Sequence, residues 1–375
     1  MKYFFFLAPL LITLLVLPGC SKPDDLPTGG QDGPPAERPE IPPLDTTASV
    51  AALEKSATSL KKNDRGNVIE VNFRGTQVGD ADLAPLAGLP ELRSVLLNET
   101  AISNEGLKTL GQLAPVQNLD LRGCAIGNDG LAHLVGLGEF GTLRALRLSG
   151  QNNMTTVDDD GMVHLAGLTS LKVLAVDFLW VSEAGLARLD KLSRLEELYM
   201  AQTTIGDDAM GLLGQFPNLK KLRISRNQVS DTGLEMLATS ARLEELDLSE
   251  NSLVSDEGFR HLAGMDSMKK LNLWRVSITD FGLEHLSGMV QMQSLNLDNS
   301  PVSDAGLVHL AKMQKLTFLH LGSTQITDVG LDHLAGLSSL QDLRVTRTAV
   351  TEEGSTRLAE KIPGIAIQLK YIEGE

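Results

Sequence analysis

Apolar residues recur along most of the chain in a unit of about 24 residues. In the copy at residues 316–337, Leu319 and Leu321 flank a polar residue. This alternation is typical of a strand with one buried face. Leucines then follow at steps of three from Leu331, which indicates a short helix with one buried stripe. Each unit therefore predicts one strand followed by one short helix.

A glycine marks the start of the helix in nearly every unit. The preferred order is Ser/Thr-Asp-x-Gly, as at residues 327–330. These glycines are Gly106, Gly130, Gly161, Gly185, Gly233, Gly258, Gly282, Gly306, Gly330 and Gly354. Asp82 and Ala209 fill the same position in two further copies. The step between these positions is constant, except that it is longer from Gly130 to Gly161 and from Gly233 to Gly258.

The residues around this glycine predict how the helix begins. We expect the Ser or Thr to cap the helix and the acidic residue to interact favourably with the helix dipole. Because Ala209 can replace the glycine, a positive φ is not required. Close approach of a neighbouring strand is the expected reason for the glycine.

Twelve copies at a fixed period predict a solenoid, because a single copy cannot bury its own apolar face. Parallel strands lie about 4.8 Å apart, whereas helices pack at about 8–10 Å, so the stack must curve with its strands inside. The sequence thus predicts an α/β fold over residues 67–361. We expect a right-handed β-α horseshoe with a parallel sheet on the concave face and short helices on the convex face.

The unit L-x-L-x-x-T-x-I-T-D-x-G-L-x-x-L resembles the leucine-rich repeat family, over about four fifths of the chain. The F-box members of that family share this rhythm, but nothing before residue 67 resembles an F-box. The resemblance implies a horseshoe scaffold, and a scaffold does not by itself fix a chemistry.

The start of the chain predicts export. Residues 1–19 are apolar after Lys2, and Leu17-Pro18-Gly19-Cys20 resembles the lipobox of bacterial lipoproteins, although that family prefers a small residue at the position of Pro18. The resemblance implies lipidation of Cys20 and a membrane-anchored protein of the cell envelope, in the outer membrane or facing the periplasm. The alternative is an ordinary secretory signal cleaved nearby.

Three further segments frame the repeats. Residues 20–46 are rich in proline and predict a disordered linker. Residues 47–66 carry apolar residues at helical spacing and predict an N-terminal capping helix. Residues 362–375 are expected to form a C-terminal cap and tail.

Composition and motifs argue against several classes of function. A net charge of −15 disfavours nucleic-acid binding. No phosphate-binding loop, nucleophile elbow or zinc-protease motif is found, so we expect no catalytic residue, no cofactor and no metal. Cys124 occupies a position held elsewhere by threonine and is expected to be buried. Six histidines share one repeat position, which favours a structural role: His133, His164, His261, His285, His309 and His333.

The residues that alternate with the strand leucines form the candidate binding face. Aromatic residues and arginine dominate protein interfaces. We therefore expect a protein partner, and a monomeric chain, with these contact residues: Tyr199, Arg223, Asp247, Asn272, Trp274, Phe318, His320 and Arg344. The alternatives are a passive envelope or spacer protein and a module that binds cell-wall glycan.

Overall fold

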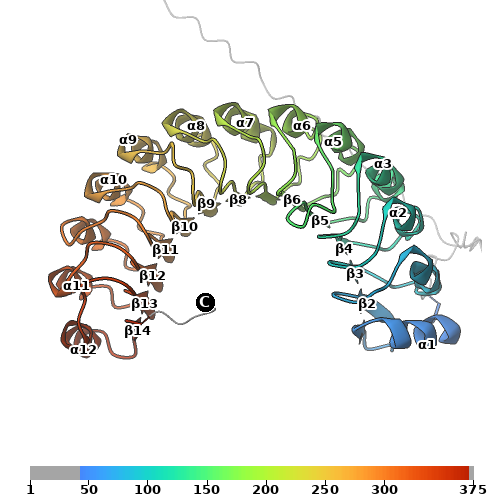
Figure 1. Ribbon diagram of the computed structural model, residues 1–375, viewed down its shortest axis with the longest axis horizontal. Coiled ribbons are helices and arrows are strands. Elements are labelled where there is room, and N and C mark those ends of the chain that lie inside the picture. The colour runs from blue at the N-terminus through green and yellow to red at the C-terminus, as the bar shows by residue number, and fades with distance from the viewer. Residues whose placement is uncertain (1–42, 371–375) are drawn as a thin grey trace, which may run out of the picture. The chain divides into compact units, whose positions relative to one another are not determined.

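The computed structural model describes residues 43–370, and within them one sheet, parallel from β2 onward, runs along the inside of an arc of stacked repeats (Figure 1). The strands follow one another in sequence order, and short helices line the outside of the arc. Consecutive strands pair in parallel from β2 onward, with equivalent residues opposite one another, as for Leu222 and Leu246. The predicted horseshoe solenoid is confirmed.

Each strand of the sheet is short. The strands are β1 (Ser59–Lys62), β2 (Val68–Asn72), β3 (Ser94–Leu96), β4 (Asn118–Asp120), β5 (Ala145–Ser149), β6 (Val173–Asp177), β7 (Glu197–Tyr199), β8 (Lys221–Arg223), β9 (Glu245–Asp247), β10 (Lys270–Asn272), β11 (Ser294–Asn296), β12 (Phe318–His320), β13 (Asp342–Arg344) and β14 (Ala366–Gln368).

The helices are also short and alternate with the strands. The α-helices are α1 (Thr47–Ser56), α2 (Asn104–Leu110), α3 (Asn128–Leu131), α4 (Val135–Phe140), α5 (Asp159–Leu165), α6 (Glu183–Ala187), α7 (Asp207–Leu212), α8 (Asp231–Leu237), α9 (Asp256–Phe259), α10 (Asp280–Leu286), α11 (Asp328–Leu334) and α12 (Glu352–Lys361). The 3₁₀ helices are η1 (Asp80–Gly88), η2 (Ala132–Leu134), η3 (Leu213–Gln215), η4 (Arg260–Leu262) and η5 (Gly306–Leu310). Within residues 43–370, no helix has the length and apolar character needed to span a membrane.

A continuous apolar core lies between the sheet and the helices. The central leucine of each short strand faces this core, and Leu222, Leu246 and Leu271 each expose only 2% of their surface. The helix leucines, such as Leu331 and Leu334, close the core from the outside. Strand alternation therefore leaves the residues on either side of each leucine on the concave face.

The N-terminal cap differs from the helix predicted over residues 47–66. Helix α1 ends at Ser56, and β1 then pairs antiparallel with β2. The chain reverses in a turn at residues 63–66, where Gly66 adopts φ +85° and Asn63 N–H donates to Asn67 O at 2.9 Å. Gly66 meets the need for a positive φ in this turn, and the turn brings β1 back over the open edge of β2.

The linker predicted over residues 20–46 also ends earlier than expected. Asp45 already belongs to the cap, since its Oδ2 accepts a hydrogen bond from Val68 N–H at 2.6 Å. Thr46 N–H donates to Gly88 O at 3.0 Å. The predicted leader at residues 1–19, Cys20 and the linker as far as residue 42 lie outside the described residues.

A ladder of hydrogen bonds joins each helix start to the next. The first residue after the cap, usually Asp, accepts the backbone N–H of the cap residue one repeat later, at 2.5–3.1 Å. The accepting and donating residues are Asp80 and Ser103, Asn104 and Gly127, Asn128 and Asp158, Asp159 and Ser182, Glu183 and Gly206, Asp207 and Ser230, Asp231 and Ser255, Asp256 and Thr279, Asp280 and Ser303, Asp304 and Thr327, and Asp328 and Thr351.

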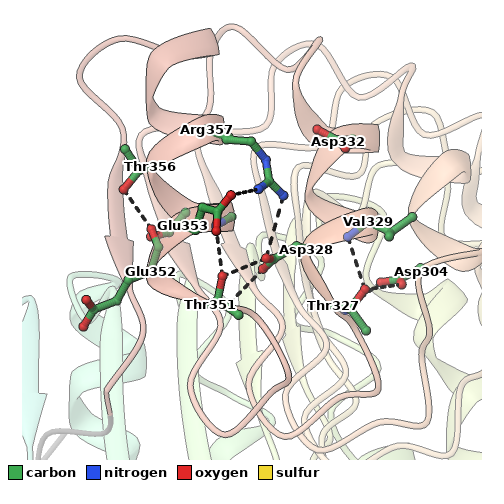
Figure 2. A network of polar contacts seen from close by, with 12 residues as sticks. Asp304, Thr327, Asp328, Val329, Asp332, Thr351, Glu352, Glu353, Thr356 and Arg357 are labelled. Atoms are coloured by element: carbon green, nitrogen blue, oxygen red, sulfur yellow. Dashed lines mark hydrogen bonds and ion pairs between the residues drawn. The ribbon is translucent and has the colours of Figure 1, made fainter.

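Figure 2 shows the last two steps of this ladder. Thr327 caps its own helix by accepting from Val329 N–H at 3.2 Å, as predicted, while its hydroxyl donates to Asp304 at 2.7 Å. Asp328 likewise accepts from the N–H and the hydroxyl of Thr351. These bonds lower the pKa of Asp328. The acidic residues, interpreted from the sequence as acting on their own helices, thus mainly connect neighbouring repeats.

The ladder explains the recurring glycine. None of these glycines has a positive φ, as predicted. A Cβ on Gly106 would lie 2.5 Å from Asp80 Oδ1, and the other anchor glycines meet the preceding ladder residue in the same way. The close neighbour is therefore the carboxylate or amide of the previous helix, and the predicted strand contact is wrong. In the one repeat where Ala209 replaces the glycine, the hydrogen-bond acceptor from the preceding helix is the longer side chain of Glu183.

We expect Gly282→Ala to destabilise the protein by about 1–3 kcal/mol, because the added methyl group overlaps the Asp256 carboxylate and Ile278. Gly288→Ala is the matched control, since a Cβ there meets no atom within 4 Å. Urea unfolding of the two variants and the wild type measures the difference. Equal free energies of unfolding for the two variants would contradict the ladder as the reason for the glycine.

Candidate functional site

The parallel register gathers most of the predicted contact residues into one row on the concave face. Tyr199 lies opposite Arg223, and Arg223 opposite Asp247. The row continues through Asn272 and Asn296 to His320 and Arg344. Phe318 lies at the other end of its short strand, and Trp274 lies two residues beyond Asn272, past the end of β10. The prediction had omitted Asn296.

Three aromatic residues of the candidate face are each covered by an arginine. The guanidinium carbon of Arg223 lies 4.9 Å from the ring centroid of Tyr199. The same distance is 4.5 Å for Arg275 over Trp274 and 5.4 Å for Arg344 over Phe318. Such cation–π contacts hold both side chains in place. The face therefore presents large side chains that already contact one another before any partner arrives.

Tyr199 has a further constraint. Its hydroxyl donates to Glu197 Oε2 at 2.8 Å. Burial and this hydrogen bond raise the pKa of Tyr199, so the phenol stays protonated near neutral pH. The ring can therefore offer an apolar surface to a partner while its polar end stays satisfied.

Between β7 and β10, charges alternate in sign from repeat to repeat at two positions of the unit. These positions are the first residue of the strand and the residue just before it. Glu197, Lys221, Glu245 and Lys270 form one such column, with ion pairs of 3.0–3.9 Å. In the neighbouring column, hydrogen bonds from Lys172 and Lys220 lower the pKa of Glu196. These charges neutralise one another. The alternation is visible in the sequence at the spacing of the repeat, and it was not used in the prediction.

Arg223 is bound to the fold as well as exposed on the face. Its guanidinium forms an ion pair and hydrogen bonds with Asp177, which exposes only 3% of its surface. Asp177 also accepts from Ala201 N–H at 2.8 Å. A buried carboxylate needs such partners. Arg223 therefore has a structural role that the sequence did not reveal.

The side chains of Asp247 and Asn272 form a hydrogen bond with each other. Asn272 Nδ2 donates to Asp247 Oδ1 at 2.9 Å, and the hydroxyl of Ser249 donates to the same oxygen at 2.7 Å. A partner would have to compete with these bonds. Their contribution to binding is therefore expected to be smaller than that of the aromatic residues.

Two depressions lie along the candidate face. The smaller one has a volume of about 260 Å³ and lies between Tyr199 and Ser294, with Leu222, Leu246 and Leu271 beneath it. The larger one, of about 730 Å³, follows the carboxyl ends of the strands. Its lining includes Gln151, Asn152, Asp177, Phe178 and Trp274. The insertion that lengthens one repeat near residue 151 therefore borders the same groove as the candidate face.

The remaining chemistry-bearing residues have structural surroundings. Cys124 is fully buried, its thiol donates to Leu97 O at 3.1 Å, and burial raises the pKa of this thiol. Its prediction as a buried repeat residue is confirmed. The six repeated histidines each follow an anchor glycine by three residues, near the end of a helical turn. Within residues 43–370, no three His, Cys, Asp or Glu side chains are grouped as metal ligands.

Comparison with known proteins agrees with this geometry. A family model described as Leucine Rich repeat matches residues 114–135, 217–238 and 312–335. No curated protein sequence matches the chain significantly. Three segments of the chain thus match the leucine-rich repeat model, and the fold agrees with it; leucine-rich repeats are typical of protein–protein interaction modules.

Solved structures share the fold at low sequence identity. An internalin from Listeria monocytogenes is 18% identical, with a TM-score of 0.59 over 88% of this chain and 96% of its own. A chain of the yeast Rad7 and Elc1 complex is 19% identical, with a TM-score of 0.53 over 77% of this chain and 83% of its own.

We expect Arg223→Ala to lower the free energy of unfolding by about 1–3 kcal/mol, because it leaves the buried carboxylate of Asp177 short of hydrogen-bond donors. Arg242→Ala is the control, since Arg242 is exposed and bonds Asn218 at the surface. Thermal unfolding compares the two variants. If Arg223→Ala proved as stable as the control, Arg223 would have no structural role.

Proposed function

We propose that the protein is a non-catalytic, membrane-anchored module that binds another protein through its concave face between β7 and β13. The observation that carries this proposal is the set of three aromatic residues, each fixed by an arginine: Tyr199 with Arg223, Trp274 with Arg275, and Phe318 with Arg344. Aromatic residues and arginines carry most of the binding free energy in protein interfaces.

Fixed side chains favour binding for an entropic reason. Each flexible side chain that becomes ordered at an interface costs about 0.5–1.5 kcal/mol. The arginines over Tyr199, Trp274 and Phe318 already contact these rings within the free protein. Less of this cost therefore remains when a partner docks.

The arrangement of charge supports a protein surface as the partner. Between β7 and β10 the face alternates in sign, so it offers no extended field of one charge that would suit a polyanion. The nearby depression above Leu222, Leu246 and Leu271 can receive a side chain of a partner. We expect a monomeric chain, with the face open to a different protein.

Anchoring forms the second part of the proposal. The sequence Leu17-Pro18-Gly19-Cys20 supports cleavage before Cys20 and its lipidation. The proline-rich residues that follow could extend by about 3.1 Å per residue. The repeats would then work at a distance from the membrane of the cell envelope.

We expect Trp274→Ala to weaken capture of the partner at least about tenfold, because truncating an interface anchor typically costs about 2 kcal/mol or more. Thermal stability should change little, since Trp274 lies beyond the strand and outside the apolar core. Affinity capture with the tagged full chain, followed by titration of the captured protein, measures the effect. Trp180→Ala is the control, because Trp180 is the chain's second tryptophan and 75% exposed, outside this face. Equal capture by both variants would place the docking surface elsewhere.

We expect Cys20→Ser to release the protein from membranes or to leave its leader uncleaved, because serine cannot accept the thioether-linked lipid. Detergent extraction of the membrane fraction and mass spectrometry of the N-terminus test this. A wild-type mature chain that begins at any residue other than Cys20 would contradict the lipid anchor.

A further inference from the structure

The sheet reaches the surface of the concave face at one place. The strand leucines of β4 to β7 and of β11 to β13 expose 0% of their surface, whereas Leu222, Leu246 and Leu271 of β8 to β10 each expose 2%. Because these side chains point into the core, the exposed part lies on the concave side of the sheet. It is the floor of the depression of about 260 Å³ that extends from Tyr199 to Ser294. We call this depression the β8–β10 slot.

Contacts between the two residues that flank a strand leucine close the sheet elsewhere. On β7, the hydroxyl of Tyr199 donates to Glu197 at 2.8 Å, so these side chains meet above the leucine between them. On β13, Arg344 and Asp342 form an ion pair at 3.7 Å in the corresponding place. In both strands the leucine between the pair is fully covered. A contact across the strand therefore covers the sheet.

Such a contact is prevented on β8 and β9 by like charges. Lys221 and Arg223 flank the leucine of β8, and Glu245 and Asp247 flank the leucine of β9. Residues two apart on a strand project from the same face, about 6.7 Å from each other. Like charges at this distance repel one another and cannot form an ion pair. The slot therefore stays open.

The walls of the slot are held along the arc instead of across it. In one wall, Lys270 pairs with Glu245 of the preceding strand at 3.0 Å. In the other wall, Asn272 donates to Asp247 of the preceding strand at 2.9 Å. These contacts draw the side chains of β10 toward β9 and leave the floor uncovered. They also use the charges of the walls, so a partner gains little by offering a charge.

The surroundings of the slot favour an apolar side chain. The backbone of β8, β9 and β10 is paired on both sides within the sheet, so the floor has few free hydrogen-bonding groups. The aliphatic stems of Lys221 and Lys270 and the ring of Tyr199 line the slot. An apolar side chain therefore gains most by leaving water here.

The shape of the slot favours a flat ring. Its floor spans three strands, about 10 Å along the arc, whereas its walls begin only about 6.7 Å apart. A ring that stands upright between the walls needs about 3.5–4 Å on each face, which matches this width. A branched aliphatic side chain is thicker and contacts both walls only by spreading them.

The charges of β8 add a preference for an aromatic ring. Lys221 and Arg223 lie on opposite walls, so a ring above Leu222 would have a cation on each face. Cations within about 6 Å of an aromatic ring are attracted to its face. Arg223 already makes such a contact with Tyr199, at 4.9 Å. A phenol hydroxyl would lose water without gaining a partner at the paired floor, so phenylalanine fits better than tyrosine.

We infer that the β8–β10 slot binds a phenylalanine side chain of the protein partner, with its ring upright above Leu222 between Lys221 and Arg223. This inference rests on the proposed function, because it names the partner side chain that the concave face recognises. It also predicts binding of a small phenylalanine probe without the partner.

The test uses the isotope-labelled full chain in detergent micelles. Nα-acetyl-phenylalanine N-methylamide is titrated while the amide NMR signals of Leu222 and Leu246 are followed, and protein-free micelles give the free probe concentration. The matched probes are the cyclohexylalanine, tyrosine and alanine analogues. The cyclohexylalanine ring has similar size but is thicker and has no π system. We expect the phenylalanine probe to bind most tightly and to shift both signals.

Glu245→Lys tests whether the open slot is required. The new ammonium group would be repelled by Lys221 and Lys270 and would face Asp247, so we expect an ion pair across β9 like the one on β13. Such a pair covers the floor and should weaken binding of the phenylalanine probe at least about tenfold. Glu244→Lys is the control, because it makes the same charge change outside the lining of the slot.

Lys221→Gln tests the cation without closing the slot. We expect the dissociation constant of the phenylalanine probe to rise about two- to fivefold, and that of the cyclohexylalanine probe to stay unchanged. Lys220→Gln is the control, since Lys220 pairs with Glu196 outside the slot. Melting curves verify that every variant is folded, and Lys221→Gln carries the test if Glu245→Lys does not fold.

Three results would overturn the inference. They are binding of the cyclohexylalanine or tyrosine probe as tight as that of phenylalanine, undiminished binding by folded Glu245→Lys, and no shift of the Leu222 and Leu246 signals. The partner distinguishes the two proposals. Capture that is lost in Trp274→Ala but unchanged in Glu245→Lys retains the proposed function without the phenylalanine site. Capture unchanged in both removes the proposed function.

Discussion

The hydrogen bonds from each helix start to the next are the interaction on which the stack depends. A repeat in a solenoid packs mainly against its immediate neighbours, so no distant contact can replace a lost step. Each carboxylate must approach the next helix closely, and glycine leaves the space. The repeat in which alanine replaces this glycine shows that the residue at the glycine position depends on the length of the preceding acceptor side chain. Glu183 reaches Gly206 N–H at 2.5 Å with a longer side chain, and Ala209 is then accommodated and fully buried.

Because the ladder lies at the helix starts, it leaves the strand residues of the concave face free to differ between repeats. These residues divide into two kinds. Between β7 and β10, charges of opposite sign in consecutive repeats pair with each other. Between β11 and β13 no such alternation occurs, and Asp298 and His320 remain without side-chain hydrogen bonds in the described part of the chain. Polar groups of the face that are available for new contacts therefore lie where this internal pairing stops.

The period of the sequence was sufficient to predict the solenoid, and strand alternation was sufficient to place Tyr199 and His320 on one face. Contacts between repeats were harder to predict. Asp304 was assigned to its own helix, whereas its hydroxyl donor, Thr327, lies 23 residues later. Such pairs become visible only when the register is known. Only the second half of the N-terminal cap was assigned wrongly, because Leu60 fits a helical spacing as well as a strand. The turn before Asn67 is what pairs this segment with β2 as a strand.

The strand that follows the insertion is joined to the candidate face through one ion pair. Strands β5 and β6 are longer than their neighbours, and their pairing extends to Ser149 and Asp177. The carboxylate of Asp177 at the end of β6 is buried, and burial requires a strong donor. Arg223, two strands away, supplies it and is thereby held over Tyr199. The strand that follows the insertion and the candidate face are therefore connected, because the carboxylate at the end of β6 holds the arginine that lies over Tyr199.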